Sequence, residues 1–165
     1  MQLTRKRNNG ELRTYDINIT HHESNDRNKN YYSLVVPSTH PDKHAGILTF
    51  RLTKYDGEKA AFLLDVFVPE NEETKGKGNG AALLQAMEYV AGKHLAKYII
   101  GKFYPHDTTK SKDEMINFYE SHGYSVDETW EIYKRVSIVD IVKNIEPYII
   151  NYEIETISEH TQDGM

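Results

Sequence analysis

Apolar side chains recur at every second position in several stretches of the N-terminal half of the chain. This period of two is typical of strands that bury one face. The strands predicted on this basis cover residues 12–20, 31–36, 47–55 and 59–68. Asp56-Gly57 separates the last two, and this dipeptide favours a two-residue hairpin turn. We therefore expect antiparallel strands in series, with a frayed segment over 1–10 and a polar loop over 21–30.

After Gly80 the apolar period changes to three and four residues, which predicts an amphipathic helix. Farther along, Ser111 and Glu114 have the spacing of a capping box, and His122-Gly123 has the composition of a helix end. The other elements predicted are a strand over 98–103, a helix over 111–123, paired strands over 124–126 and 130–136, and a tail from 137 with helix-like and then strand-like spacing.

The segment Lys75-Gly76-Lys77-Gly78-Asn79-Gly80-Ala81 joins the strand over 59–68 to this helix. Its three glycines remove the Cβ atoms that would block a close approach, and the first N–H groups of a helix have no intrahelical partner. Lys75 and Lys77 add positive charge. The segment therefore predicts a binding site for a phosphate or a diphosphate.

Two nucleotide-binding motifs contain a similar glycine-rich turn. A P-loop requires Gly-Lys-Ser/Thr, whereas Gly80 is followed by Ala81-Ala82. The dinucleotide fingerprint Gly-x-Gly-x-x-Ala matches over 76–81, but the acidic residue expected about twenty positions on is missing, because 100–102 reads Ile-Gly-Lys. The antiparallel strands upstream also differ from a doubly wound sheet, so neither nucleotide-binding fold is predicted.

The chain has 165 residues, of which 38% are hydrophobic and 27% charged, as in one soluble globular domain. Its net charge of −5 argues against nucleic acid as the main partner. No apolar run is long enough for a bilayer and no charged-then-apolar leader opens the sequence, so we expect a cytoplasmic protein without a membrane partner.

The chain has no cysteine, which excludes a thiolate nucleophile. The histidines lack metal-ligand spacing in a predicted helix, so no metal site is predicted.

Two motifs with a helix and a strand between them characterise the middle of the chain. The first is the glycine-rich segment over 75–80, which follows a strand end that reads Val66-Phe67-Val68-Pro69. The second is Phe118-Tyr119 in a helix, followed by Gly123-Tyr124 at a strand start. This combination resembles the GNAT superfamily of acetyl-CoA-dependent N-acetyltransferases, whose loop signature Gln/Arg-x-x-Gly-x-Gly/Ala is matched here with Lys in the first place. The resemblance covers roughly residues 12–136.

The resemblance implies an α/β fold of the α+β type, with a mixed, mainly antiparallel twisted sheet and flanking helices. It also implies a V-shaped split between the fourth and fifth strands, which would lie between Val66–Val68 and Tyr98–Ile100. We expect residues 1–136 to form the acetyltransferase domain. Residues 137–165 would form a C-terminal extension, packed on the domain or at the interface of a homodimer, with a disordered acidic end.

The resemblance further implies acetyl-CoA as the cosubstrate. The N–H groups of the glycine-rich segment would hold the diphosphate of coenzyme A, and Lys112 would reach a phosphate. The backbones of Phe67 and Val68 would pair with the pantetheine arm, and one of their N–H groups would polarise the thioester carbonyl. The cofactor-binding residues expected are Phe67, Val68, Lys75, Gly76, Lys77, Gly78, Asn79, Gly80, Ala81 and Lys112.

Members of the superfamily attack the thioester directly with a neutral amine, which requires a base for the ammonium proton and an acid for the departing thiolate. Tyr119 matches the superfamily's tyrosine acid. Asp65 is the candidate base, because period two places it on an apolar face with Leu63 and Phe67, where burial raises the pKa of a carboxyl group. The alternative for Asp65 is a solvated or hydrogen-bonded strand residue.

The sequence does not identify the acceptor, which is expected to be an amine on a small molecule or on a protein. The acidic residues Glu70, Glu72 and Glu73 would either attract a cationic amine or form a solvated turn. The superfamily's helix pair after the first strand has no counterpart over 21–30, so the acceptor site would be open, built from loops, or completed by the tail or a second subunit. Two other functions fit: a non-catalytic acyl-CoA-binding regulatory module, and a protein-interaction domain on a decayed GNAT fold.

Overall fold

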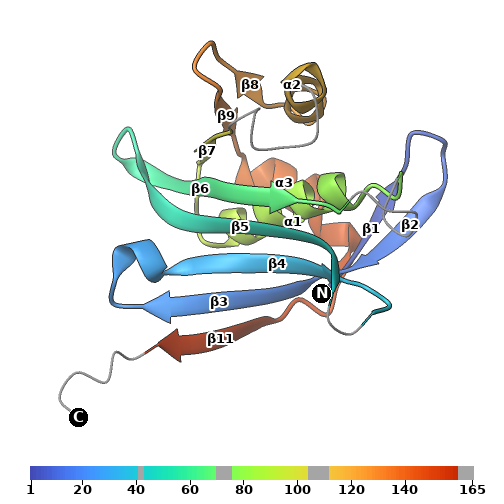
Figure 1. The fold of residues 1–165 in the computed structure, drawn as a ribbon, viewed down its shortest axis with the longest axis horizontal. Coiled ribbons are helices and arrows are strands. Elements are labelled where there is room, and N and C mark those ends of the chain that lie inside the picture. The colour runs from blue at the N-terminus through green and yellow to red at the C-terminus, as the bar shows by residue number, and fades with distance from the viewer. Residues whose placement is uncertain (41–42, 70–75, 104–111, 160–165) are drawn as a thin grey trace.

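The computed structural model describes residues 1–40, 43–69, 76–103 and 112–159 of the chain (Figure 1). Its elements are, in chain order, β1 (Gln2–Lys6), β2 (Leu12–Asp16), β3 (Asn18–Ser24), η1 (Arg27–Lys29), β4 (Tyr31–Pro37), β5 (His44–Tyr55), β6 (Glu58–Phe67), α1 (Asn79–Lys93), β7 (Tyr98–Lys102), α2 (Lys112–Glu120), β8 (Ser125–Val126), β9 (Glu131–Arg135), α3 (Ile138–Asn144), η3 (Glu146–Tyr148), β10 (Ile149–Ile150) and β11 (Ile154–Glu159).

Within the described residues, eight strands form the main sheet in the order β11-β3-β4-β5-β6-β7-β9-β8. From β3 to β6, each strand pairs antiparallel with the next, as the alternating pattern predicts. The predicted hairpin at Asp56-Gly57 is confirmed, and both residues have the positive φ (50° and 76°) that such turns require. β6 pairs with β7 in parallel and β7 with β9 antiparallel, which confirms a mixed, mainly antiparallel sheet.

A smaller sheet, β10-β1-β2, lies beside the main one near the start of α1 (Figure 1). The prediction of a frayed N-terminus is therefore wrong, because β1 pairs with both β2 and β10. The single strand predicted over 12–20 is also wrong, because β2 belongs to the small sheet and β3 to the main sheet. Tyr15, Ile17 and Ile19 are all buried across the junction, so the alternation continues where the chain changes sheets.

The polar segment over 21–30 is not the loop that its composition predicts. β3 continues to Ser24, and only the short η1 precedes β4. Imidazole rings take the place of aliphatic side chains here, since His21 stacks on Tyr32 at 4.2 Å and His22 on Tyr31 at 4.4 Å between ring centroids. These cross-strand ring pairs stabilise a strand that hydropathy alone does not reveal.

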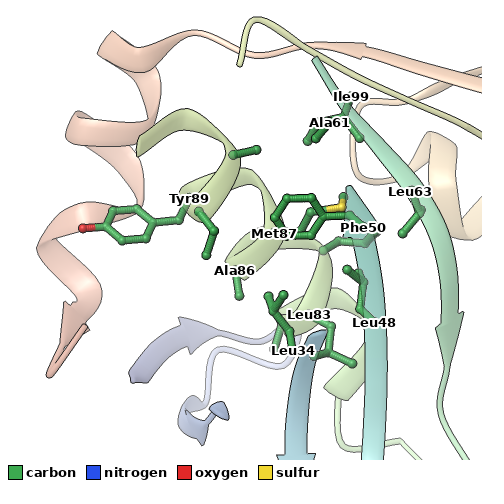
Figure 2. Close-up of a cluster of buried hydrophobic side chains, with 14 of the residues drawn as sticks. Leu34, Leu48, Phe50, Ala61, Leu63, Leu83, Ala86, Met87, Tyr89 and Ile99 are labelled. Atoms are coloured by element: carbon green, nitrogen blue, oxygen red, sulfur yellow. The ribbon is translucent and has the colours of Figure 1, made fainter. Parts of the chain in front are cut away.

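The main contact between helix and sheet is made by α1, which covers one face of the sheet. Leu83 and Met87 of α1 are fully buried, and Figure 2 shows them directed at the sheet. The residues that face them are Leu34, Leu48 and Phe50. Because each buried side chain of this size contributes about 1.5–3 kcal/mol, this contact fixes the helix that follows the glycine-rich segment.

The tail from 137 folds as α3, η3, β10 and β11. Ile141 of α3 packs directly on Gly92 of α1, where a Cβ would collide with it. Asn151, at φ 55°, turns the chain between β10 and β11, so the expected strand through 150–154 becomes two strands in different sheets. The division of the chain at residue 136 stays a prediction, and the acidic end over 160–165 lies outside the described residues.

Candidate active site

The glycine-rich segment ends in a tight turn that leads directly into α1. Gly76 and Gly78 have positive φ angles of 68° and 79°, a conformation that favours glycine. The first backbone hydrogen bond of the helix runs from the Ala82 N–H to the Gly78 carbonyl oxygen, at 3.0 Å. Within the described residues, the N–H groups of 77–81 have no backbone acceptor. This is the anion-binding geometry that the sequence predicts, although Lys75 itself lies outside the described residues.

Side chains from outside the turn hold it in place. The Asn79 side-chain amide donates to the Ala45 carbonyl oxygen of β5 at 3.1 Å. The Tyr15 hydroxyl of β2 donates to the Lys77 carbonyl oxygen at 2.5 Å, and the Arg7 guanidinium donates to the Gly76 carbonyl oxygen. Sequence reasoning missed Tyr15 and Arg7, because these contacts join residues 62 and 69 positions apart and no local pattern marks them.

The split between β6 and β7 begins where their parallel pairing ends. The last pair is Leu63 with Gly101, and a Cβ at Gly101 would lie 2.9 Å from the Leu63 carbonyl oxygen. Glycine therefore allows the two strands to meet closely before they separate. Tyr98–Ile100 are paired with Ala60–Phe62, so the predicted opening beside Tyr98–Ile100 is wrong, and the opening lies farther along both strands.

The pairing of β6 with β5 becomes irregular just after this point. The register of β6 against β5 shifts at Leu64, which is the extra residue of a β-bulge. On the other side, the Phe103 N–H donates to the Trp130 carbonyl oxygen at 3.1 Å, which keeps the end of β7 close to the start of β9. β6 and β7 therefore separate as expected, but the separation begins after Leu63 and Gly101 and not beside Tyr98–Ile100.

The end of β6 connects this split to the glycine-rich turn. Successive N–H groups of a regular strand point to opposite edges, so beyond the bulge, along 65–67, they alternate between β5 and the split. Phe67 is 54% exposed and lies edge-on to His44 at 6.2 Å. Val68 packs 3.6 Å from the position that a Cβ on Gly80 would occupy. An extended ligand paired with β6 would thus run directly toward the N-terminus of α1.

The second predicted motif lies against the first. Phe118 Cζ lies 3.2 Å from the position that a Cβ on Gly80 would occupy, so α2 contacts the beginning of α1 through a glycine. Tyr119 is 2% exposed and stacks on Phe103 at 5.4 Å, directly after the end of β7. The fold therefore brings the glycine-rich turn, the split and Tyr119 together.

Tyr119 remains protonated in this environment. Burial, and to a smaller extent the charge of Asp65, raise the pKa of its hydroxyl well above the usual value of 10. A thiol with an ordinary pKa of about 8.5 is a stronger acid than this phenol, so full proton transfer from Tyr119 to a thiolate is uphill. The hydroxyl is well suited to donate a hydrogen bond to a departing sulfur, and the acid role of Tyr119 stays a prediction.

Asp65 is exposed, contrary to the burial expected for a base with a raised pKa. The bulge at Leu64 is the cause, because it changes which positions face the core. Leu63 before the bulge and Val66 after it pack against the core, so Asp65 does not share a face with Leu63. Asp65 still influences the pKa of Tyr119, which places its carboxylate beside the split. Its role as a base stays a prediction.

Lys112 begins α2 and lies beside an aromatic ring. Its Nζ is 4.3 Å from the centroid of the Trp130 ring, close enough for a cation–π interaction. Both residues border an open groove of about 660 Å³ lined by Lys112, Ile116, Val126, Asp127, Glu128, Thr129 and Trp130. The phosphate contact predicted for Lys112 stays a prediction, and Ser111 of the proposed capping box lies outside the described residues.

A buried ion pair lies next to Tyr119. Glu88 of α1 is 7% exposed and pairs with Lys134 of β9, whose Nζ also donates to the His122 carbonyl oxygen at 2.8 Å. Burial raises the pKa of Glu88, and the charge of Lys134 opposes this rise. Lys134 also lies 5.2 Å from the ring centroid of Tyr124, which is edge-on to Tyr119. Sequence reasoning missed this pair, although an isolated glutamate in an apolar, alanine-rich helix is a usable signal.

Among the described residues, no group of three or more histidine, aspartate or glutamate side chains could hold a metal ion. No helix in the same residues is long and apolar enough to cross a bilayer.

No family model matches the sequence, and no curated protein matches it either. Solved structures do match. AtaTR bound with acetyl-CoA aligns with a TM-score of 0.54 over 72% of this chain and 75% of its own, at 16% identity. An acyl-CoA N-acyltransferase from Klebsiella pneumoniae aligns with a TM-score of 0.51 over 65% and 73%, at 16% identity. A GNAT-family acetyltransferase from Desulfovibrio desulfuricans aligns with a TM-score of 0.50 over 65% and 69%, at 17% identity.

The chain has the GNAT fold. In this fold β6 and β7 are the strands expected to part, and α1 is the helix that follows the glycine-rich segment. The GNAT helix pair expected after the first strand has no counterpart in the described residues, where the short η1 alone links β3 and β4.

Proposed function

We propose that the chain is an N-acetyltransferase that moves an acetyl group from acetyl-CoA to a primary amine. The observation that carries this proposal is the row of N–H groups over 77–81 without backbone acceptors, at the start of α1 and beside the split between β6 and β7. The GNAT fold supports it, and AtaTR, a protein of the same fold, is known with acetyl-CoA bound.

The cofactor would lie along the end of β6. The diphosphate of coenzyme A would accept hydrogen bonds from the turn at Gly76–Ala81, where the helix dipole also favours negative charge. The pantetheine arm would pair with Phe67 and Val68 as an added strand, and an N–H group of β6 would polarise the thioester carbonyl. In this arrangement the sulfur would lie near Tyr119, because Tyr119 stacks on Phe103 directly after the end of β7 and Phe118 beside it contacts Gly80.

The chemical step is a direct attack. The amine nitrogen forms a bond to the acetyl carbon, the carbon–sulfur bond breaks, and the electron pair leaves on sulfur. The Tyr119 hydroxyl donates a hydrogen bond to that sulfur, while the ammonium proton passes to water held by the exposed Asp65 carboxylate. The water relay follows from the exposure of Asp65, since a solvated carboxylate is within reach of both the acceptor and bulk water.

The acceptor is proposed as an amine on a small molecule or on a protein, because the short η1 that links β3 and β4 adds no helix pair that would restrict the choice between them. A cytoplasmic location and a homodimer stay predictions from the sequence.

Release of free thiol from acetyl-CoA, followed across a mixed panel of polyamines, amino acids and peptides, tests the proposal. We expect thiol release that depends on one class of amine and stoichiometric acetylation of that amine by mass spectrometry. Binding of coenzyme A without amine-dependent thiol release would contradict catalysis, and no binding at all would contradict the cofactor site.

A second function is favoured by one observation. Asp65 is exposed, and within the described residues β6 offers no buried carboxylate in its place. A non-catalytic acyl-CoA-binding module would have this arrangement. Calorimetry that shows tight acetyl-CoA binding, together with no thiol release for any amine, would favour it over the enzyme.

A further inference from the structure

We propose that Tyr15 and Arg7 are positioning residues that hold the diphosphate loop in its binding conformation, so that the N-terminal hairpin β1–β2 takes part in coenzyme A recognition. This inference rests on the proposed function for the identity of the ligand. Neither residue belongs to the loop or to the helix that follows it, and both act on the loop through its carbonyl groups.

The argument begins with the geometry of the peptide group. The described part of the chain has no cis peptide bond, so the carbonyl of one residue and the N–H of the next point in opposite directions. The Gly76 carbonyl is held by Arg7, which directs the Lys77 N–H away from the hairpin. The Lys77 carbonyl is held by Tyr15, which directs the Gly78 N–H the same way. Two neighbouring carbonyl contacts thus fix two neighbouring donors toward the diphosphate position.

The loop needs such contacts, because glycine is the residue with the greatest backbone freedom. Gly76 and Gly78 provide the positive φ angles of the turn, but they do not by themselves favour it over other conformations. A preformed site binds its ligand without the entropy loss of ordering the loop. The hydrogen bonds from Tyr15 and Arg7 supply this ordering before the ligand arrives.

The hairpin is rigid enough for this task. Tyr15 is 3% exposed and Leu3 is fully buried, so both strands of the hairpin contribute to the core. The Arg5 guanidinium donates to the Gln85 side chain of α1 at 2.7 Å, which connects the hairpin to the helix behind the loop. At the turn of the hairpin, the Arg7 N–H donates to the Glu11 carbonyl oxygen at 2.8 Å, which fixes the backbone that carries the guanidinium.

Gly78 shows how closely the hairpin and the loop fit. A Cβ at this position would lie 2.7 Å from the Tyr15 hydroxyl oxygen. The glycine is therefore required for two reasons: the positive φ of the turn, and the space that the tyrosine hydroxyl occupies. At Gly76, the second loop glycine with a positive φ, no atom of the described residues lies within 4 Å of the corresponding position.

The test compares binding of coenzyme A to wild type, Tyr15→Phe, Arg7→Gln and the double variant by calorimetry. We expect the Kd to rise about fivefold to tenfold for each single variant and further for the double variant, since each loses one ordering hydrogen bond. We expect two matched control variants to bind coenzyme A with the Kd of wild type. Tyr152→Phe removes the hydroxyl of a tyrosine packed on the other end of α1, and Arg135→Gln removes an exposed arginine from β9.

Acetyl-pantetheine, which lacks the diphosphate, separates positioning from general damage. In the variants, KM for acetyl-CoA should rise while kcat and the kinetics with acetyl-pantetheine stay unchanged. A second readout needs no ligand: in proton–nitrogen NMR spectra, the Lys77 and Gly78 amide signals should shift or broaden in Tyr15→Phe, while those of the β5–β6 hairpin stay in place.

The outcomes are distinguishable. Absence of coenzyme A binding to wild type would overturn the proposed function. Binding to wild type with unchanged affinity in Tyr15→Phe would overturn the positioning role, even if Arg7→Gln weakens binding, because Arg7 would then contact the phosphate itself. An equal loss of activity with acetyl-CoA and acetyl-pantetheine would overturn it as well, since the effect would be on the whole site.

Discussion

The two sides of the split between β6 and β7 are built differently. The proposed cofactor side uses backbone N–H groups, glycines with positive φ, and carbonyls held by Tyr15 and Arg7. The proposed acceptor side has an exposed carboxylate at Asp65 and the short η1 where GNAT proteins are expected to have a helix pair. A ligand with invariant chemistry can be bound by backbone geometry, whereas an acceptor that differs between proteins is recognised by side chains and by added elements.

The largest expected effect comes from Gly78→Ala, which tests whether the cofactor side depends on backbone geometry. The Cβ would meet the Tyr15 hydroxyl and would also strain a residue at φ 79°, so we expect the Kd for coenzyme A to rise by at least about 100-fold. Calorimetry measures this change.

Gly57→Ala is the matched control for that experiment, because Gly57 has a similar φ of 76° with nothing within 4 Å of the Cβ position. It should lose some stability and keep its affinity. Equal affinities for the two variants would show that the turn at Gly78 does not form the cofactor site.

Lys134→Met tests how much the ion pair between Lys134 of β9 and Glu88 of α1 stabilises the fold around the split. Loss of this partner leaves Glu88 buried without its counter-charge, and we expect a loss of about 3 kcal/mol of unfolding free energy at pH 7, measured in urea. Burial raises the pKa of Glu88 above its ordinary 4.5, so its contribution to stability is complete below that value and is lost as pH rises through the folded-state pKa.

Without Lys134 the pKa of Glu88 rises further, so the difference between Lys134→Met and wild type should shrink as the pH falls from 7 toward 5. The double variant Glu88→Gln/Lys134→Met should recover most of the stability at pH 7. A loss independent of pH and not recovered by the double variant would mean that Lys134 acts through packing alone.

Tyr119→Phe tests the hydrogen bond to the leaving sulfur. Because the raised pKa favours hydrogen bonding over proton transfer, we expect kcat to fall about 30-fold, with little change in KM for acetyl-CoA. Steady-state thiol release measures both constants. Tyr124→Phe is the matched control: it removes a buried neighbouring hydroxyl that has no partner in the described residues, and it should keep kcat. Full activity of Tyr119→Phe would remove Tyr119 from the mechanism.

Asp65→Asn has the smallest expected effect and concerns the acceptor side. A carboxylate that acts through water is replaced in part by other solvent molecules, so kcat/KM for the amine should fall only about fivefold. Asp16→Asn, which removes an exposed carboxylate from β2, should leave the kinetics unchanged. A fall of about 1000-fold for Asp65→Asn would show instead that Asp65 contacts the amine directly.

The sequence predicted the parts of this molecule that local patterns encode. The hairpin at Asp56-Gly57, the glycine-rich turn and the Phe118-Tyr119 helix are each specified by neighbouring residues, and each is present. The exposure of Asp65 could not be predicted in the same way. The bulge at Leu64 arises from the pairing of β6 with β5, and beyond it each side chain of β6 points to the face opposite to the one that period two predicts. Period-two reasoning assumes a regular strand, and it fails one residue after an insertion of this kind.

The contacts of Tyr15 and Arg7 with the glycine-rich turn could not be predicted for a different reason. Arg7 lies in a polar segment that resembles a frayed end, Tyr15 lies in a predicted strand, and the partners of both are far along the chain. The pairings of β10 and β11 could not be predicted either, because β10 pairs with β1 and β11 with β3, both near the N-terminus. Long-range pairing of this type leaves no periodic trace in a single sequence.

The pairing of β1 with both β2 and β10 has a consequence for biosynthesis. One edge of β1 remains open until residues 149–150 have left the ribosome, although the glycine-rich turn has emerged long before. Because contacts between distant parts of a chain form slowly, the nascent protein would carry the glycine-rich turn beside an incompletely paired hairpin during the second half of its synthesis. We therefore expect the hairpin β1–β2 and the glycine-rich turn that it contacts to reach their final structure late in the folding of the chain.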